Sequence, residues 1–372
     1  MQISDPPPSM PTTKQKNYLE EFHAISKKVS GIFDSYLITE IEKRSDSDLF
    51  KMLYRKFLEA KKGRAHNRAV FVYIAAKFFD IPIDSDLKNI LPLMVIPELS
   101  IWSNYALNWV TDEKNNVSGT KLEENIDIVA SQYLLTEVLY FLPDRMLRKY
   151  LEWYRRCLRG YISVEIDLTI TNFERLENEG DFWIAYNRNH CIADVGELYA
   201  YCFEMVNEYF MLKTPDKQMR KIRKIMLEFG ATLQINGDIS DFIIPNDLIS
   251  TTEKRPRKDY FIDIRTDRLT YPIWLLLKKC KTENPELFKE IKKVAKERIS
   301  SDEFFWHVHA YLKKSEIIKE VLGYIRKQKN RLLREIDKLG IENEGLKLWK
   351  AALLILTDNK FARQIKRDYD IV

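Results

Sequence analysis

The stretch PELSIWSNYALNWVTDEKNNVSG, Pro97 to Gly119, decides the fold because it reads as a buried helix that carries polar side chains. Its apolar face at helical spacing consists of Leu99, Trp102, Ala106, Trp109 and Val110. A separate polar line, about one turn between members, consists of Asn104, Asn108 and Asp112. Mg²⁺ prefers carboxylate and amide oxygens, so Asn108, Asp112 and the following Glu113 are candidate metal ligands.

A second segment of the same character is GATLQINGDISDF, Gly230 to Phe242. Gln234, Asp238 and Asp241 are spaced to share one face of a helix there. We therefore expect two acidic helices that face each other across a helical bundle, with Asp238 and Asp241 as further metal ligands.

Composition favours one large all-α domain. The 372 residues are 45% hydrophobic and 12% aromatic, which is enough for a sizeable core, and only 11 are glycine, which disfavours glycine-loop folds. We expect a disordered leader over residues 1–17 and a single domain over 18–372, whose last ~90 residues add amphipathic helices. The formal charge of +5, from 60 basic and 55 acidic residues, does not predict nucleic-acid binding.

Nothing in the sequence predicts a transmembrane segment, because the most apolar window, Ile90 to Trp102, is interrupted by Pro92, Pro97 and Glu98. The four cysteines have no zinc-site spacing and read as reduced thiols. A cytoplasmic protein is the expectation.

Helical periodicity predicts several helices. They span Tyr18–Lys43, Asp48–Lys62, Ile126–Leu142, Asp181–Lys213 and Lys217–Phe242, while Tyr161–Thr171 could be extended or continue a helix. Within the long middle helix, Ala193, Gly196 and Ala200 would permit close helix packing, and His190 reads more readily as a core residue than as a catalyst.

Each of two basic segments has two possible interpretations, an anion-binding site or a solvated loop. Lys61, Lys62, Arg64 and Arg68 lie at the start of an apolar helix, where the helix dipole disfavours cations, so they indicate either a bound anion or a solvated loop. The loop Ser250–Pro272 is a phosphate-closing lid or, equally, a solvated basic loop, and its cations are Lys254, Arg255, Arg257, Lys258, Arg265 and Arg268.

Taken in order, these segments resemble the polyprenyl synthetase family of trans-isoprenyl diphosphate synthases. KKGRAHNRAVF (61–71) stands where that family has its GKR-type turn, and NWVTD (108–112) stands where it has its first DDxxD motif. LQINGDISD (233–241) is similar to FQIxDDxxD, with Gly237 in place of the first aspartate, and DIRTDRLTYP (263–272) is similar to the DxxxGKxTxP lid. His190-Cys191 replaces the Lys-Thr pair, and the paired arginines after the first motif are absent from Val117-Ser118-Gly119.

The resemblance implies an isoprenoid synthase-type helical bundle with a central active-site cavity and bound Mg²⁺. It implies catalytic roles for Asp112, Asp238 and Asp241, with Asn108 and Glu113 as further metal ligands. It implies diphosphate binding by Arg64, Arg68, Arg188, Gln234, Lys258, Arg265 and Arg268. It also implies a homodimer or a subunit of a heteromer.

Three functional interpretations follow. The first is a class I terpene synthase-like lyase that ionises and cyclises one prenyl diphosphate, because the second diphosphate site lacks its arginine pair. The second is a prenyltransferase with an altered acceptor site, involving Arg64, His66 and Arg68. The third is a non-catalytic homologue, since Trp109 cannot coordinate Mg²⁺.

Overall fold

The computed structural model describes residues 13–44, 51, 65–83, 85–111, 121–240, 242–243 and 261–357, and gives only the backbone for some helical residues, 108–111 among them. Every named element in these ranges is a helix, which confirms the all-α prediction. In chain order the elements are α1 (Thr13–Arg44), α3 (Asn67–Phe78), α4 (Leu91–Thr111), α5 (Lys121–Phe141), η1 (Asp144–Met146), α6 (Leu147–Ile166), η2 (Ile170–Leu176), α7 (Glu179–Trp183), η3 (Ile184–Gly196), α8 (Glu197–Tyr209), α9 (Asp216–Ser240), α11 (Ile262–Arg265), α12 (Tyr271–Glu283), α13 (Pro285–Glu297), α14 (Asp302–Lys314), α15 (Ile317–Asp337) and α16 (Glu344–Leu356).

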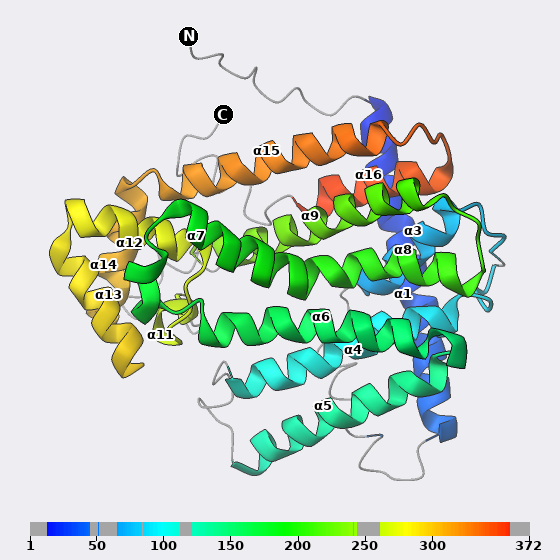
Figure 1. The fold of residues 1–372 in the computed structure, drawn as a ribbon, viewed down its shortest axis with the longest axis horizontal. Helices are drawn as coiled ribbons and strands as arrows, with labels where there is room; N and C mark the ends of the chain where they lie inside the picture. The colour runs from blue at the N-terminus through cyan, green and yellow to red at the C-terminus, as the bar shows by residue number, and fades with distance from the viewer. Residues whose placement is uncertain are drawn as a thin grey trace.

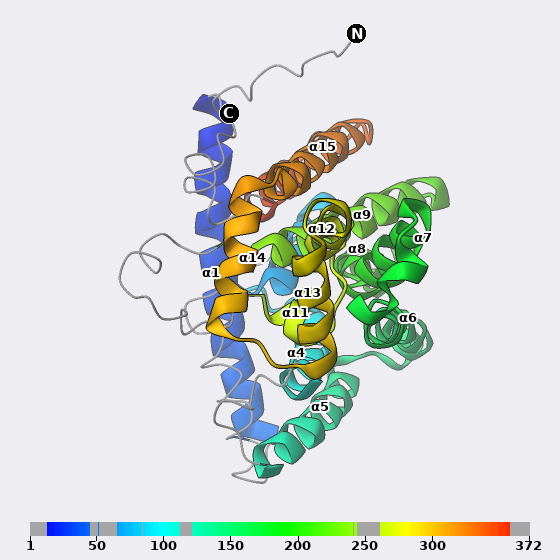
Figure 2. The same cartoon turned by 90° about the vertical axis from the view of Figure 1, so that its left-hand side faces the viewer.

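The helices form a layered bundle. In Figure 1, α4, α6, α9 and α15 run roughly along the long axis of the molecule, and α1 crosses them steeply. Figure 2 shows α1 along one side of the bundle, and Figure 1 shows α11 to α14 gathered at one end. Within the bundle, α9 packs against η3, α8 and α15, and α3 packs against α1, α4, α8 and α16.

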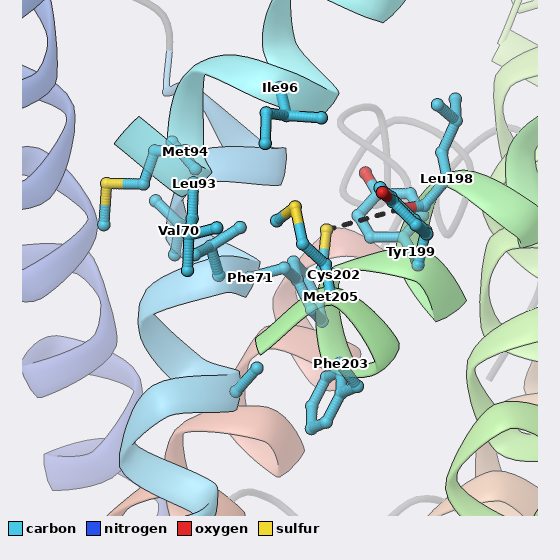
Figure 3. Close-up of a cluster of buried hydrophobic side chains, with 14 of the residues drawn as sticks. Val70, Phe71, Leu93, Met94, Ile96, Leu198, Tyr199, Cys202, Phe203 and Met205 are labelled. Carbon is cyan, nitrogen blue, oxygen red and sulfur yellow. Dashed lines mark hydrogen bonds between the residues drawn. The ribbon is translucent and has the colours of Figure 1, made fainter. Parts of the chain in front are cut away.

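The main core lies where α3, α4 and α8 meet. The Phe71 ring of α3 packs edge-on against the Tyr199 ring of α8, with centroids 4.8 Å apart. Figure 3 shows Met94 of α4 extending away from α8, and all three side chains are buried. Burial of each large apolar side chain contributes roughly 1.5–3 kcal/mol relative to exposure. A second cluster joins α12, α13, α14 and the first half of α15, and it holds the far end of the bundle together.

Helix starts follow local capping chemistry. The side chains of Asn178, Asn284, Ser301 and Asn343 accept hydrogen bonds from backbone N–H groups in the first turns of α7, α13, α14 and α16. Such caps satisfy donors that have no partner inside the helix. The caps help to define where α7, α13, α14 and α16 begin, and Leu356, the last residue of α16, lines a cavity of the bundle.

Most predicted helices are confirmed, although α1 begins at Thr13 rather than at Tyr18. The helix predicted over Asp48–Lys62 lies outside the described residues, Lys51 excepted. The segment after Tyr161 continues the helix to Ile166. The long middle helix is not uniform, because residues Ile184–Gly196 form a π-helix between α7 and α8. None of the described helices is both long and apolar enough to cross a membrane.

Candidate functional site

A cavity of about 360 Å³ lies at the centre of the bundle. Its walls come from α3, α4, α6, η3, α8, α9, α11 and the residues that follow α11. Its polar and aromatic lining includes Arg68, Asn104, Tyr105, Tyr161, His190, Asp194, Tyr199, Gln234, Asp238, Asp263 and Arg268. Charged groups of both signs therefore meet in one partly open cavity, which is unusual for a helical core.

Asp238 is the carboxylate that α9 brings to this cavity, and it is 5% exposed. The Tyr186 hydroxyl donates a hydrogen bond to Oδ2, and Gln234 Nε2 donates to Oδ1 over 2.8 Å. Gln234 lies one turn before Asp238, so the predicted shared face is confirmed for this pair. Two neutral donors hold the carboxylate in place without cancelling its charge.

Arg68 brings a buried positive charge to the cavity from the first turn of α3. Its guanidinium lies over the Tyr199 ring, with Cζ 5.5 Å from the ring centroid, and the side chain is 8% exposed. Burial by itself lowers the pKa of Arg68, but the surrounding Tyr105, Tyr199 and Glu98 outweigh burial and raise it. Nε of Arg68 has no hydrogen-bond partner among the described residues. A ligand anion would give this donor a partner.

The N-terminus of α3 is occupied by the chain's own carboxylate. Glu98 Oε1 accepts hydrogen bonds from the backbone N–H groups of Arg68 (2.9 Å) and Ala69 (3.3 Å). Its Oε2 lies 3.5 Å from Nδ1 of His66, whose Nε2 lies 2.7 Å from Asp34 Oδ1. Glu98 therefore supplies an anion at this helix end, and Asn67 and Arg68 are the described residues of the first turn of α3 that line the cavity.

A second cation, Arg268, enters the cavity wall from the segment after α11. This segment is pinned to the end of α6: Thr169 and Arg268 form an antiparallel bridge, and Leu269 N donates to Leu168 O over 2.7 Å. Asp267 adds hydrogen bonds from the backbone N–H and the hydroxyl of Thr171. The described part of the predicted lid is thus attached at its C-terminal end.

The π-helix η3 presents His190 and Asp194 to the same cavity. Gly160 of α6 permits this approach, because a Cβ there would lie 2.5 Å from the backbone N of Asp194. His190 Nδ1 lies 3.3 Å from Gly160 O, and since a carbonyl only accepts, Nδ1 carries the proton. Burial chiefly, with the charge of Arg268, lowers the pKa of His190 to about 4, so the ring is neutral at pH 7.

The sequence-predicted site residues divide into three groups. Arg68, Gln234, Asp238 and Arg268 line the cavity together. Arg188 is exposed, and neither it nor the half-buried Arg265 lines the cavity. The rest lie outside the described residues, namely Arg64, Asp112, Glu113, Asp241, Lys258 and the side chain of Asn108.

Sequence reasoning indicated Tyr105 as a group that stabilises cations, but it missed Asp194, Tyr161 and Tyr199, and it assigned His190 to the core. His190 is buried, as expected of a core residue, but it also faces the cavity. The spacing of His190 and Asp194, four residues apart, was the available signal. An i, i+4 pair shares one face in any helix of this kind, but the sequence does not show that the face is hollow.

Metal binding is supported by donor chemistry but not by a complete ligand set. No three His, Cys, Asp or Glu side chains in the described ranges lie close enough together to hold a metal ion. Carboxylate oxygens are the ligands that hard cations prefer, and Asp238 lines the cavity. Asp238 can therefore contribute to a hard-cation site, whose other candidate ligands are outside the described residues.

The comparisons identify the fold. No protein-family model matches the sequence, and no curated protein matches it either. A polyprenyl synthase from Caulobacter crescentus, solved with calcium and isoprenyl diphosphate, matches with a TM-score of 0.71 at 13% identity over 95% of this chain and 100% of that one.

Two further solved structures are similar. One is a geranylgeranyl pyrophosphate synthase from Lactobacillus brevis, with a TM-score of 0.70 at 15% identity over 92% of this chain and 99% of that one. The other is a heptaprenyl diphosphate synthase from Staphylococcus aureus, with a TM-score of 0.63 at 18% identity over 93% of this chain and 99% of that one. The fold that the sequence resemblance implied is confirmed: it is the all-α fold of these synthases.

Proposed function

We propose that this protein is a prenyltransferase: it binds an allylic prenyl diphosphate in the central cavity, ionises it, and joins the prenyl group to an acceptor. The observation that carries the proposal is the meeting of Arg68, Arg268, Gln234 and Asp238 around one cavity. The likeness to prenyl diphosphate synthases over nearly the whole chain supports it.

Arg68 and Arg268 take the diphosphate in this proposal. A guanidinium presents several N–H donors in a planar fork that matches phosphate oxygens, and a buried one acts at low local dielectric. The leaving group gains negative charge as the C–O bond breaks, so a desolvated arginine stabilises the transition state more than the ground state. The tyrosine rings of the cavity, Tyr105, Tyr161 and Tyr199, then face the developing carbocation.

A divalent cation, Mg²⁺, completes the proposed site. The oxygen donors that would hold it are those of Asp238 and Asp241 on one side and of Asn108, Asp112 and Glu113 on the other. When bound, such an ion supplies positive charge to the leaving diphosphate. Asp238 is held ready for this by Tyr186 and Gln234.

Cyclisation of a single substrate is the second candidate, and one observation favours it. The stretch Val117-Ser118-Gly119 has no arginine pair, whereas a second diphosphate would need several cationic donors. The proposed prenyltransferase and the cyclase differ only in whether the acceptor double bond belongs to another molecule.

The test is incubation of purified protein with Mg²⁺ and geranyl, farnesyl or geranylgeranyl diphosphate, with and without isopentenyl diphosphate. Mass spectrometry of volatile and phosphatase-treated extracts should show a longer prenyl chain only with the isopentenyl partner. A cyclic product without it would establish the cyclase instead. No product in any tube would contradict both and favour the non-catalytic homologue, whose partner could then be sought.

Arg68→Met removes the charge but keeps an unbranched side chain, and we expect it to raise KM for the diphosphate at least about 10-fold. Arg145→Met is the matched control, because Arg145 also lies over a tyrosine, Tyr209, with Cζ 5.8 Å from the ring centroid, but outside the cavity. Equal KM values for the two variants would contradict the role of Arg68.

We also propose a cytoplasmic homodimer. Four free, buried cysteines support a reducing compartment. Exposed apolar side chains on α5 (Ile128, Val129, Leu139, Tyr140) and on α6 (Leu147, Leu151, Ile162, Ile166) support burial of this part of the surface against a second copy.

A further inference from the structure

Asp194 is a carboxylate that the proposed diphosphate and metal chemistry does not use. It lines the cavity from η3 on a side chain that is only half-buried, because the cavity itself gives access to it. No hydrogen bond or ion pair with another described residue involves its carboxylate, whereas Asp238 is held by two donors. An acidic side chain inside a bundle without such partners is costly and needs an explanation.

The surroundings of Asp194 combine enclosure with positive charge. Arg68 of α3 and Arg268 after α11 are the cations of this cavity, while Asp238 of α9 and Asp263 of α11 are its other carboxylates. His190 on its own helix is neutral at pH 7, and Tyr105, Tyr161 and Tyr199 complete the ionisable lining. Burial raises the pKa of Asp194 to about 6, although Arg68 and Arg268 oppose the increase. A carboxylate of this kind is ionised at pH 7 and accepts a proton more readily than an ordinary aspartate.

Carbon–carbon bond formation from a prenyl cation that ends in an alkene must include the loss of a proton. The C–O bond of the allylic diphosphate breaks, and its electron pair leaves on the diphosphate oxygen. The π electrons of an acceptor double bond then form the new C–C bond and leave a cation on the acceptor. Loss of a neighbouring proton restores the double bond, and that proton needs a base inside the cavity.

We propose that Asp194 is this base: its carboxylate takes the proton from the acceptor-derived cation, and the electrons of the broken C–H bond form the product double bond. The inference rests on the proposed function. It holds for an acceptor double bond in a second molecule or in the same one. The proton returns to solvent when product and diphosphate leave.

His190 and the departing diphosphate are weaker candidates for this base. His190 is tied to Gly160 O through Nδ1, and its pKa of about 4 makes its free Nε2 a poor proton acceptor. The departing diphosphate would be bound to Arg68 and Arg268, whose charges reduce its basicity.

The test compares wild type with Asp194→Asn and Asp194→Glu, measuring diphosphate release and C–C product in the same reaction. Asp194→Asn should release diphosphate within a few-fold of the wild-type rate, whereas the unsaturated C–C product falls about 10²–10⁴-fold and a hydroxylated C–C product accumulates because water captures the acceptor-derived cation. Asp194→Glu keeps a carboxylate and should recover part of the product. Wild-type product formation should increase with pH through about 6, and the Asp194→Asn variant should lack this step.

Glu204→Gln is the matched control. Burial also raises the pKa of Glu204, but this side chain bonds Arg223 and lies outside the cavity, so the product pattern and pH step should persist. If Asp194→Asn had the product yield and pH profile of the wild type, the role assigned to Asp194 would be overturned, while the proposed function would stand. Loss of diphosphate release together with product would also overturn it, in favour of a role in substrate binding. A wild-type protein that releases no diphosphate would instead overturn the proposed function on which the assignment rests.

Discussion

Tyr186 controls the position of the carboxylate of Asp238. Its ring is buried and stacked on Phe182, with centroids 5.1 Å apart, so Tyr186→Phe should fold normally while it loses the hydrogen bond to Asp238 and the contact of the hydroxyl with Cys191. Groups that orient a metal-binding carboxylate typically contribute about 10–100-fold to activity, and we expect a loss of that size in kcat/KM.

Tyr201→Phe provides the control for this substitution. Tyr201 is equally buried and stacked, here on Trp153, but its hydroxyl has no hydrogen-bond partner among the described residues. Its removal should leave kcat/KM unchanged. A similar effect of both substitutions would mean that Tyr186 acts only through packing.

His66 makes the stability depend on pH in the alkaline range. Burial by itself lowers its pKa, but hydrogen bonds and charges from Asp34 and Glu98 outweigh burial and raise the pKa from 6.5 to about 9. The folded state therefore binds the proton more tightly than the unfolded state. The resulting stability is complete below pH 6.5 and is lost as pH increases through 9, by about 3 kcal/mol in total.

Urea unfolding at pH 6, 7.5 and 9.5 measures this free energy. His66→Gln should remove most of the alkaline decrease. His309→Gln should retain it, because burial lowers the pKa of His309 to about 4 and shifts its effect to acidic pH. An unchanged alkaline decrease in His66→Gln would contradict the assignment.

For single residues, the sequence predicted the contacts that depend on spacing within one helix. Gln234 and Asp238 lie one turn apart on one helix, so their pairing follows from periodicity. Asp194 and Tyr199 could not be found in this way, because the cavity that they share with Arg68 depends on how η3, α8 and α3 pack.

The crossing of η3 and α9 is the element-scale feature that positions the site, since these helices carry Asp194 and Asp238. A Cβ on Gly230 of α9 would lie 2.6 Å from the Cα of Gly196. Gly230→Ala should therefore separate the helices and destabilise the fold by about 1–3 kcal/mol, with a parallel loss of activity.

Gly237→Ala on the same helix is the control for that change. A Cβ on Gly237 would meet nothing within 4 Å, so alanine should stabilise the helix by roughly 0.5–1 kcal/mol. Thermal melting of both variants measures the difference. Equal melting temperatures for Gly230→Ala and Gly237→Ala would show that the crossing of η3 and α9 tolerates a methyl group.

The π-helix explains why element prediction from the sequence succeeded only in part. Periodicity gave one helix over Asp181–Lys213, and the chain is indeed helical from α7 through α8, ending at Tyr209. A π-helix uses ordinary helix-forming residues, and this one packs closely against its neighbours at Gly160 and Gly196. The periodicity of a single helix does not predict such contacts between helices.

On the scale of the whole molecule, the proposed homodimer predicts a surface that must be covered. Val129 of α5 is 62% exposed, and Val129→Glu should shift the protein toward monomer in sedimentation velocity. Ile299→Glu is the control, because Ile299 is 72% exposed but lies between α13 and α14, away from α5 and α6. A dimer that both variants preserve would exclude this surface.

The overall bundle was predictable because its evidence is spread along the chain. Helical periodicity, scarce glycine and the order of the two acidic segments each indicated the same fold, which the solved synthases share. The reaction was less predictable, because a fold shared at 13–18% identity does not specify chemistry.

The central claim is that the cavity around Asp238 ionises an allylic prenyl diphosphate. The most direct measurement is Mg²⁺-dependent diphosphate release from geranyl, farnesyl and geranylgeranyl diphosphate by wild type and Asp238→Asn, side by side. We predict release by wild type with at least one substrate, its loss with a chelator, and a rate at least about 100-fold lower for Asp238→Asn. No release by wild type, or equal release by both proteins, would contradict the account.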